Sequence, residues 1–474
     1  MSNALETQRV AQRWDDEALP ALEAFIRIPA KSPHFDPDWA ANGHLEAALA
    51  LGAEFCQRHL PGAEVRIERQ AGRTPLLLVD LPGSDATAGT ALLYGHLDKQ
   101  PENRGWSEGL APWEPVIREG RLYGRGAVDD GYALFSAVVA VASLQEAGLR
   151  HPRCVFVIEA CEESGSLDLP AYLDALGERI GQPDLIVCPD AGCGTYDRLW
   201  CTTSLRGMIT GTLRVDVLRE GVHSGDAGGV VPSSFRILRQ LLSRLEDPET
   251  GRVLPQLCAV EIPGLRREQA VHAGTVLGEL TRDRYPFLPG VQPQSEDPAE
   301  RILDRTWRPA LEIVGAEGLP PVAAAGNVLR PFTATQLALR LPPTADAEAV
   351  VEGLEAVLTE APPAGAQVRF EADAVASGWA APEPAPWLAQ ALEQASRAHF
   401  GAAPVHMGEG GTIPLLNGLQ RRFPQAQYLV TGVAGPGSNA HGPDEFLDLE
   451  AARRLTACLG ETLHALAVGG ACSG

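Results

Sequence analysis

Hydrophobic and polar positions change their spacing along the chain, and these changes predict which segments are helices and which are strands. Residues 5–27 and 41–59 repeat their apolar positions with helical spacing, so that Leu45, Ala48 and Leu51 share one face of the second segment. Short apolar runs typical of buried strands follow at residues 63–67, 75–81, 90–95, 153–160 and 183–189.

The order of strands and helices in the first 200 residues indicates the fold class. After the run that ends at Gly95, an apolar helix is predicted over residues 131–147 and is closed by Gly148, and two more buried strands follow it. Strand, loop, helix, strand is the order found in an α/β layer. We therefore predict an α/β domain with a mostly parallel sheet flanked by helices.

From about Ser204 the pattern changes to that of an open-faced sheet. Alternating or strand-like runs cover 206–218, 333–341 and 367–371, and helices are predicted over 233–246 and 346–360. Residues 247–325 are rich in Pro, Gly and Arg and give no clear elements. A Pro-rich linker at 375–386 precedes a helix over 387–399, a strand over 427–431 and a last helix over 449–467. We predict that an α+β domain of residues 205–380 is inserted between two parts of the first domain, 1–204 and 381–474.

Composition and charge restrict the classes of partner and compartment. With 474 residues the chain exceeds one ordinary hydrophobic core, and its formal charge of -22 argues against nucleic acid or an anionic membrane as a partner. The N-terminus lacks the pattern of a signal peptide, and no apolar stretch is long enough to span a bilayer. Nine cysteines without a CxxC pair are typical of reduced thiols, which predicts a cytoplasmic protein.

Histidine and carboxylate side chains follow the predicted strands at the points where these strands end. His96 ends one run, Glu162 and Glu163 follow the next, and Asp190 follows a third. In an open α/β sheet, ligands bind beyond the carboxyl ends of the strands. Oxygen and imidazole ligands on tight loops are what a divalent metal site requires, so the sequence predicts such a site here.

Two loops add further candidate ligands. Asp129 and Asp130 open a predicted helix, where acidic residues are ordinarily N-caps that interact with the helix dipole, and that alternative stays open on this motif alone. The preceding GRGA segment favours metal binding, because glycine lets the backbone approach an ion closely. His441 lies in a loop of Ser, Asn, Gly and Pro before the last helix.

Two pairs of residues indicate how a metal site would work. Asp98 stands two residues after His96, where its carboxylate can accept the second imidazole N–H and fix the tautomer, although a surface histidine beside an acid is the plain alternative. Glu162 and Glu163 repel each other unless a cation is near, or unless they form a solvated acidic loop. One of them can bind metal while the other acts as a general base.

Seven motifs in one order make the chain similar to a known family. They are GHLD, RGAVDDG, EESGS, CPDAG, HSGDAGG, EGGTIP and NAHGPDE, and they extend over nearly the whole chain. With them the chain resembles the co-catalytic dizinc metallopeptidases, which include aminoacylases, carboxypeptidase G-type enzymes and carnosinase-like dipeptidases. The forms GHLDKQPE, LYGRGAVDDG and EGGTIP, with Trp106 and residues 112–115, are most similar to the carnosinase-like cytosolic dipeptidase branch.

The resemblance implies a role for each motif of the first domain. His96, Asp129 and Asp190 would bind one metal ion, and a second ion would be bound by Asp129, Glu163 and His441. Asp129 would then bridge the two ions, with a cis peptide bond after it. Glu162 would be the general base, and Asp98 would orient His96. The two ions would be zinc by ligand type, with manganese or cobalt as alternatives.

For the inserted domain the resemblance implies a lid that also forms a homodimer. His223 would polarise the scissile carbonyl, reaching the partner subunit's site. Asn327 and Arg340 would hold the reacting oxygen and the substrate carboxylate. The pocket would be lined by Glu409, Gly411 and Thr412.

The implied function is that of a metal-dependent hydrolase that cleaves the amide bond of dipeptides or short peptides. Within this family, an aspartate at position 190 favours peptides as substrates. An amidohydrolase that deacylates N-acyl or N-carbamoyl amino acids is the main alternative, and a non-catalytic binding protein is a remote one. Lys99, Gly408 and Tyr132 depart from the family's usual residues, which puts the identity of the substrate in doubt.

Overall fold

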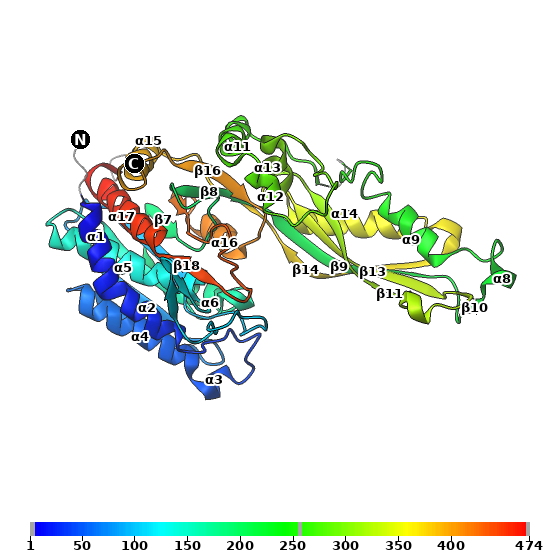
Figure 1. Cartoon of the computed structure of the whole chain (residues 1–474), viewed down its shortest axis with the longest axis horizontal. Helices are drawn as coiled ribbons and strands as arrows, with labels where there is room; N and C mark the ends of the chain where they lie inside the picture. Colours follow the sequence, from blue (N-terminus) through cyan, green and yellow to red (C-terminus); the bar gives the residue numbers. More distant parts are fainter. Residues whose placement is uncertain (1–4, 255–257, 471–474) are drawn as a thin grey trace. The chain divides into compact units, whose positions relative to one another are not determined.

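The computed structural model describes residues 5–254 and 258–470, which form two compact units (Figure 1). The first unit comprises Met1–Thr203, Ala381–His406 and Gly418–Gly474, and the second comprises Ser204–Ala380 and Met407–Asn417. Residues 407–417 therefore differ from our prediction, which placed them in the first domain.

Contacts with residues distant in the sequence explain why this segment belongs to the second unit. The hydroxyl of Thr412 donates a 2.6 Å hydrogen bond to the carbonyl of Arg206, and Glu409 forms an ion pair with Arg305 at 3.1 Å. These partners are fixed by tertiary contacts that the local sequence pattern does not contain.

The first unit is built on a six-stranded sheet in the order β1-β2-β6-β3-β7-β17. Its strands are Glu64–Glu68 (β1), Leu76–Leu81 (β2), Thr90–His96 (β3), Arg153–Glu159 (β6), Leu185–Cys188 (β7) and Gln427–Val430 (β17). β6, β3, β7 and β17 run parallel, whereas β1 and β2 are antiparallel at one edge. The predicted α/β fold with a mostly parallel sheet is confirmed.

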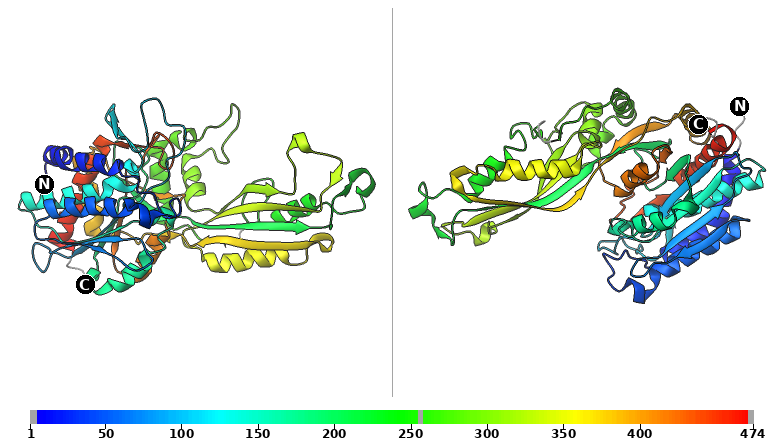
Figure 2. Two further views of the ribbon diagram at one scale, coloured as in Figure 1. Left: turned by 90° about the horizontal axis from the view of Figure 1, so that it is seen from below. Right: turned by 180° about the vertical axis from the view of Figure 1, so that it is seen from behind.

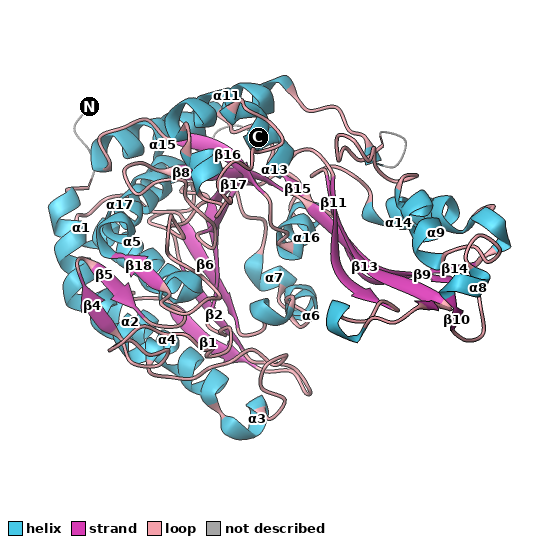
Figure 3. Cartoon of the chain, turned by 45° about the vertical axis from the view of Figure 1, so that its right-hand side comes forward, coloured by secondary structure: helices cyan, strands magenta, loops and turns pink. Residues whose placement is uncertain are grey.

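Helices cover both faces of this sheet (Figure 3). The helices of the first unit are Thr7–Arg13 (α1), Leu19–Ile26 (α2), Trp39–Asn42 (α3), His44–His59 (α4), Tyr132–Glu146 (α5), Leu169–Ala175 (α6), Gly177–Ile180 (α7), Pro386–His399 (α15) and Leu449–Ala465 (α17). Helix Pro414–Arg422 (α16) has residues in both units. The chain moves from β3 to β6 through α5 and returns past β3 to β7 through α6 and α7. Because such crossovers are right-handed, these two connections lie on opposite faces.

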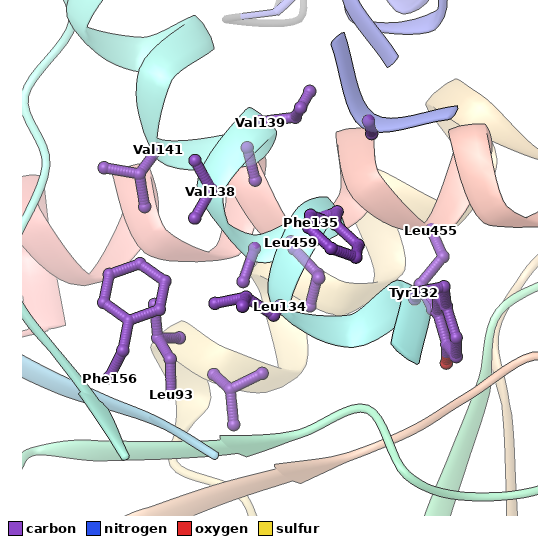
Figure 4. Close-up of a cluster of buried hydrophobic side chains, with 14 of the residues drawn as sticks. Leu93, Tyr132, Leu134, Phe135, Val138, Val139, Val141, Phe156, Leu455 and Leu459 are labelled. Atoms are coloured by element: carbon purple, nitrogen blue, oxygen red, sulfur yellow. The ribbon is translucent and has the colours of Figure 1, made fainter. Parts of the chain in front are cut away.

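Helix α5 is the centre of the hydrophobic core. Every residue from Tyr132 to Leu144 is buried, and the helix packs between α17 and the sheet, where Leu93 and Phe156 meet it (Figure 4). The segment Ala127–Glu146 is long and apolar enough to cross a membrane, but 89% of it is buried inside the protein. A core helix of this kind passes the same test of length and composition.

The second unit contains an antiparallel sheet in the order β11-β13-β9-β14. Its strands are Ala310–Glu317 (β11), Phe332–Leu341 (β13), Gly207–Asp216 (β9) and Gln367–Ala376 (β14). Buried and half-buried residues alternate along β9, so one face is apolar. That face is covered by helices Ser234–Leu242 (α9) and Ala347–Thr359 (α14), and Figure 2 shows α14 running along the sheet.

Two regions of the second unit differ from the predicted pattern. Among its described residues, the unassigned segment 247–325 contains β11, a short 3-10 helix at Val322–Ala324, and the α-helices Gly264–Leu277 (α11), Leu280–Asp283 (α12) and Pro298–Thr306 (α13). The predicted linker at 375–386 is not free of structure, because its residues Trp379–Ala380 (β15) pair with Trp200–Leu205 (β8) and Trp379 is buried. Because the linker is rich in proline, the sequence pattern did not indicate this short strand.

Lys99 connects the N-terminal helices to the loop that follows β3 through hydrogen bonds. It is one of two lysines in the chain, and it is fully buried. Its Nζ donates to the carbonyls of Phe25 and Ile28 at 2.8 Å, and to that of Ile26 at 3.3 Å. Nζ also lies 3.9 Å from the centre of the Phe25 ring. The compact ammonium group thus adds a donor to each of three carbonyls at the end of α2, of which those of Phe25 and Ile28 also accept a backbone N–H.

Replacing Lys99 by Met should lower the free energy of unfolding by roughly 1–3 kcal/mol, because the three hydrogen bonds from Nζ are lost. Calorimetric unfolding at fixed metal concentration measures the change. Lys31→Met is the matched control, since Lys31 is half-buried in an ion pair with Glu102 and such pairs contribute little. Equal stability of the Lys99→Met variant and the wild type would contradict this role.

Candidate metal centre

The carboxyl ends of three parallel strands bring the candidate ligands together in the first unit. β3 ends at His96, β6 at Glu159 and β7 at Cys188, and the loops that follow carry the acidic residues. Two groups have ligand atoms that all lie within 4.8 Å of one another: His96, Asp129 and Asp190, and then Asp129, Glu163 and His441. These are the two sets that the sequence analysis expected.

His96 is held so that one ring nitrogen faces the carboxylates. Its Nδ1 lies 3.0 Å from the backbone carbonyl of Asp98, an atom that can only accept, so Nδ1 carries the hydrogen. Nε2 lies 3.3 Å from Asp129 Oδ1 and 3.7 Å from Asp190 Oδ2, and in the neutral ring this atom offers its lone pair to a cation. The ring is buried, and among the described residues this Nε2 has no hydrogen-bond partner.

Asp129 lies between the two groups and belongs to both. Its Oδ1 faces His96, while its Oδ2 lies 2.7 Å from Nε2 of His441. The peptide bond between Asp129 and Asp130 is cis, as the resemblance implies. One carboxylate therefore presents a separate oxygen to each side, which is the arrangement of a bridging ligand.

Glu163 and His441 complete the second group. Glu163 Oε2 lies 3.4 Å from His441 Nε2 and accepts a 2.5 Å hydrogen bond from the side chain of Gln100. Its Oε1 is buried and has no hydrogen-bond partner in the part of the chain that the structure describes. Asn103 donates to the carbonyl of His441, which holds the loop.

The donor set fits divalent cations. Three carboxylates and two imidazoles converge, and two of their buried atoms, His96 Nε2 and Glu163 Oε1, lack a partner within the described ranges. Burial, and then the charge of Asp129, raises the pKa of Glu163 well above its ordinary value. A cation relieves this cost, because it favours the ionised carboxylates. Oxygen and nitrogen donors of this kind suit zinc, manganese or cobalt.

Asp98 makes more contacts than we predicted. We expected its carboxylate to face the second imidazole N–H of His96, and Asp98 Oδ1 lies 3.5 Å from His96 Nδ1, while the shorter contact of this nitrogen, 3.0 Å, is to the Asp98 carbonyl. The carboxylate oxygens also accept the backbone N–H groups of Glu162 at 3.1 Å and Glu163 at 3.0 Å. Asp98 therefore orients the turn that carries both glutamates.

Glu162 stands beside both groups without belonging to either. No described residue donates a hydrogen bond to its carboxylate, so its oxygens are free to accept a proton. Burial, and then the charge of Asp129 against that of His96, raises the pKa of Glu162 to about 7. A carboxylate with this pKa can both take up and release a proton near neutral pH.

A buried ion pair between Arg125 and Glu445 connects the two ligand loops, and the sequence analysis missed it. Arg125 Nη1 and Glu445 Oε2 lie 2.5 Å apart, and both side chains are almost fully buried. Arg125 also donates to the carbonyl of Gly442 at 2.7 Å, and Glu445 accepts the N–H of Val128 at 3.2 Å. The pair thus fixes the backbone next to Asp129 and next to His441.

Two more buried acids lie behind the ligands. Glu159 accepts hydrogen bonds from Tyr94 at 2.7 Å and from Ser166 at 2.8 Å, and burial raises its pKa to about 8. Burial also raises the pKa of Asp130 well above its usual range. Their only sequence signal was an acidic residue within an apolar run, which does not reveal whether the side chain faces the ligands or the core.

The second unit brings together four of the predicted pocket residues. Arg340 Nη1 lies 3.4 Å from the hydroxyl of Thr412, and Glu409 and Gly411 belong to the same loop. Gly411 has open space where a side chain would stand. These residues therefore surround a common point beside the end of β13.

His223 and Asn327 lie at the opposite end of β13. His223 is on Val222–His223 (β10), which pairs with Val328–Leu329 (β12), and the carbonyl of Asn327 accepts the N–H of Ser224 at 2.9 Å. Eight residue steps separate Phe332, at the start of β13, from Arg340. At about 3.3 Å per step, this is roughly 26 Å. The structure therefore does not bring His223 and Asn327 to Arg340 within one chain (Figure 1).

Comparison with known sequences gives the family. Residues 92–465 match the sequence profile of the peptidase family M20/M25/M40. The chain belongs to this family. A cysteinylglycine-S-conjugate dipeptidase from Corynebacterium striatum is 31% identical over 423 residues, which cover 88% of this chain and 89% of the relative.

Further M20 relatives agree with the resemblance to the dipeptidase branch. The human beta-Ala-His dipeptidase is 28% identical over 439 residues, covering 88% of this chain and 83% of that protein. The crystal structure of human carnosine dipeptidase 1 has the same fold, with a TM-score of 0.73 at 24% identity, and the likeness covers 97% of this chain and 98% of the other.

The structure explains two residues that depart from the usual M20 pattern. A Cβ atom at Gly408 would stand 2.4 Å from the Ser204 hydroxyl, so no larger side chain fits there. Tyr132 is fully buried and donates a hydrogen bond to the carbonyl of Pro189, next to Asp190. It connects the start of α5 to the end of β7.

Glu159 should make stability depend on pH. Its pKa of about 8 lies above the ordinary value of 4.5 for a glutamate, so unfolding releases a proton between these pH values and the contribution of Glu159 to stability falls as pH rises through this window. Glu159→Gln keeps the hydrogen-bond acceptor and should gain roughly 2–4 kcal/mol relative to the wild type between pH 5 and pH 8, at about 1.4 kcal/mol per pKa unit.

Thermal unfolding at several pH values measures this difference. Glu355→Gln, an exposed change on α14, is the control and should leave the pH dependence unaltered. If the Glu159→Gln and wild-type curves stay parallel from pH 5 to pH 8, Glu159 is already ionised in the folded protein.

Proposed function

We propose that this M20 protein is a metal-dependent hydrolase that cleaves the amide bond of dipeptides or short peptides. The observation that carries the proposal is the shared carboxylate of Asp129, whose two oxygens face His96 and His441 at 3.3 Å and 2.7 Å. A ligand divided in this way serves two neighbouring cations. The names of the relatives, dipeptidases for cysteinylglycine conjugates and for beta-Ala-His, support short peptides as substrates.

Two cations would be held by residues of the first unit alone. His96, Asp129 and Asp190 would bind one, and Asp129, Glu163 and His441 would bind the other. When bound, such cations lower the pKa of a water molecule from near 16 to about 7 and stabilise negative charge on a carbonyl oxygen. Zinc is our first choice, and the excess of carboxylates leaves manganese and cobalt as alternatives.

Glu162 would move the protons of the reaction. With a pKa of about 7, its carboxylate takes the proton from the attacking water and then gives it to the amine that leaves. Asp98 keeps Glu162 in place, because it accepts the backbone N–H groups of Glu162 and Glu163. Gln100 holds Glu163 on the other side.

We propose that the active protein is a homodimer in which His223 and Asn327 serve the partner's site. An extended dipeptide spans about 7 Å. The roughly 26 Å along β13 between these residues and Arg340 is therefore too long for one substrate to touch both within one chain. His223 is exposed, so it is available to a second copy, where it would stabilise the oxyanion.

Deacylation of N-acyl or N-carbamoyl amino acids is the competing activity on this scaffold. Asp190 and the names of the relatives favour peptides. Relative rates on dipeptides and on N-acetyl and N-carbamoyl amino acids separate the two. A cytoplasmic location is supported by thiols that are buried and form no disulfide, at Cys56, Cys154, Cys161, Cys188, Cys201, Cys258 and Cys458, whereas Cys472 lies outside the described residues.

Replacing Glu162 by Gln should lower kcat by about 10²–10⁴-fold and leave the metal content near normal, because the base is lost and the ligands remain. Asp129→Asn should lose both ions, since both groups share this carboxylate. Asp130→Asn is the matched control and should keep its metal, because Asp130 is in neither group. Elemental analysis measures the metal content, and dipeptide kinetics measure kcat. A loss of kcat of tenfold or less in Glu162→Gln would refute the assignment of Glu162 as the general base.

Mixing two inactive variants tests the exchange of His223 between subunits. In a mixed dimer of His223→Ala and Glu162→Gln chains, one site has both an intact Glu162 and the partner's intact His223. Equal mixing should restore about a quarter of wild-type activity, since half of the dimers are mixed and each has one intact site. No recovery, in chains shown to exchange, would place His223 in its own subunit's site or outside the chemistry.

A further inference from the structure

Three arginines of the second unit converge on the loop that follows Val405–Glu409 (β16). Arg206 lies between β8 and β9, Arg305 lies in α13, and Arg340 is next to the end of β13. The loop residue Gly410 would carry a Cβ 3.3 Å from both Arg206 Nη2 and the Arg305 side chain. The Thr412 hydroxyl contacts the carbonyl of Arg206 at 2.6 Å and the guanidinium of Arg340 at 3.4 Å.

The positive charge of this arginine cluster is not balanced within the described residues. Arg305 pairs with Glu409 at 3.1 Å, but neither Arg206 nor Arg340 forms an ion pair with a described carboxylate. Glu312 is near enough to influence Arg206, without contact. Arg284, which is exposed, adds a further positive charge near Arg305. Among Arg206, Arg305 and Arg340 alone, two guanidinium charges are left over when Glu409 is counted.

Of the three arginines, Arg206 gives the clearest indication of an anionic ligand. Burying a guanidinium without a counterion costs free energy. Its exposed fraction is 9%, and its Nη1 reaches only two backbone carbonyls, those of Asp304 and Arg308, at 3.4 Å. Nε is buried and has no hydrogen-bond partner in the described part of the chain. Burial, and then the charges of Arg340 and Arg305, lowers the pKa of Arg206 to about 10.

Space for a ligand exists beside the same loop. A Cβ built on Gly411 meets no atom within 4 Å, whereas its neighbour Gly410 is in close contact with Arg206 and Arg305. The glycines thus let the loop pack against the arginines on one side and remain open on the other. An anionic group placed there would face guanidinium donors, which bind carboxylates in a bidentate manner.

We propose that the arginine cluster, Arg206, Arg305 and Arg340, binds two carboxylates of one ligand, so that the enzyme prefers peptides ending in aspartate or glutamate. The inference rests on the proposed function and on the role that the family resemblance implies for Arg340, which is to hold the substrate carboxylate. That carboxylate balances one of the two remaining charges. The side-chain carboxylate of an acidic C-terminal residue balances the other, at Arg206 and Arg305.

Kinetics on paired substrates test the preference. Ala-Glu against Ala-Gln, and Ala-Asp against Ala-Asn, differ by one charge at nearly constant shape. The wild type should show at least a tenfold higher kcat/KM for the acidic member, mainly through KM, and the ratio should shrink at high salt. A ratio near one for the wild type would overturn the proposal.

Variants of the cluster assign the effect to its arginines. Arg305→Met should bring the Ala-Glu to Ala-Gln ratio close to one, and Arg206→Met should do the same where it folds. Because Arg305→Met leaves Glu409 without a partner, Arg305→Met with Glu409→Gln is the charge-balanced form and should behave alike. Arg239→Met, an exposed arginine on α9, is the matched control and should keep the wild-type ratio. An unchanged ratio in both Arg305 variants would overturn the assignment.

A binding experiment separates this inference from the proposed function. Calorimetry with glutarate, a dicarboxylate without an amide bond, should show binding that weakens at least tenfold in Arg305→Met, whereas the monocarboxylate butyrate should bind weakly to both. Hydrolysis of Ala-Gln without glutarate binding would overturn the inference and leave the peptidase intact. Arginine-dependent glutarate binding without hydrolysis of any dipeptide would support the anion site and refute the peptidase.

Discussion

The concentration of negative charge at one edge of a parallel sheet is the constraint on which the structure of the first unit depends. Asp129, Glu163 and Asp190 are half-buried and converge with two imidazoles, of which that of His96 is buried and that of His441 is exposed. Carboxylates in such a place are tolerated only if protons or cations accompany them. The surrounding contacts hold the acids close together, which makes this edge of the sheet selective for a divalent cation.

Much of the site could be predicted from the sequence, because the ligands follow strand ends. His96 and Asp190 stand directly after apolar runs, and in a parallel sheet such positions meet at one edge. The groups that position the ligands were less visible. Asp98 has a carboxylate that could reach either His96 or the next turn, and spacing alone does not say which backbone N–H groups it accepts.

The fold was predicted best where elements are long and apolar, as in α5 and β6. It was missed where tertiary contacts define the element. The strand at Trp379 is short and surrounded by Pro and Gly, and only its pairing with Leu205 makes it a strand. In the sequence, Glu445 looks like any acidic residue of a loop. Its role is visible only in the structure, where it pairs with Arg125, 320 residues earlier. Patterns in the sequence report local geometry well and long-range pairing poorly.

The ion pair between Arg125 and Glu445 has a consequence for how the protein is made. The loop carrying Asp129 is joined to that of His441 by two residues that are 320 positions apart in the chain. The second ligand group therefore cannot form until both segments of the first unit have been synthesised. A nascent chain that stalls between them holds Asp129 and Glu163 without His441.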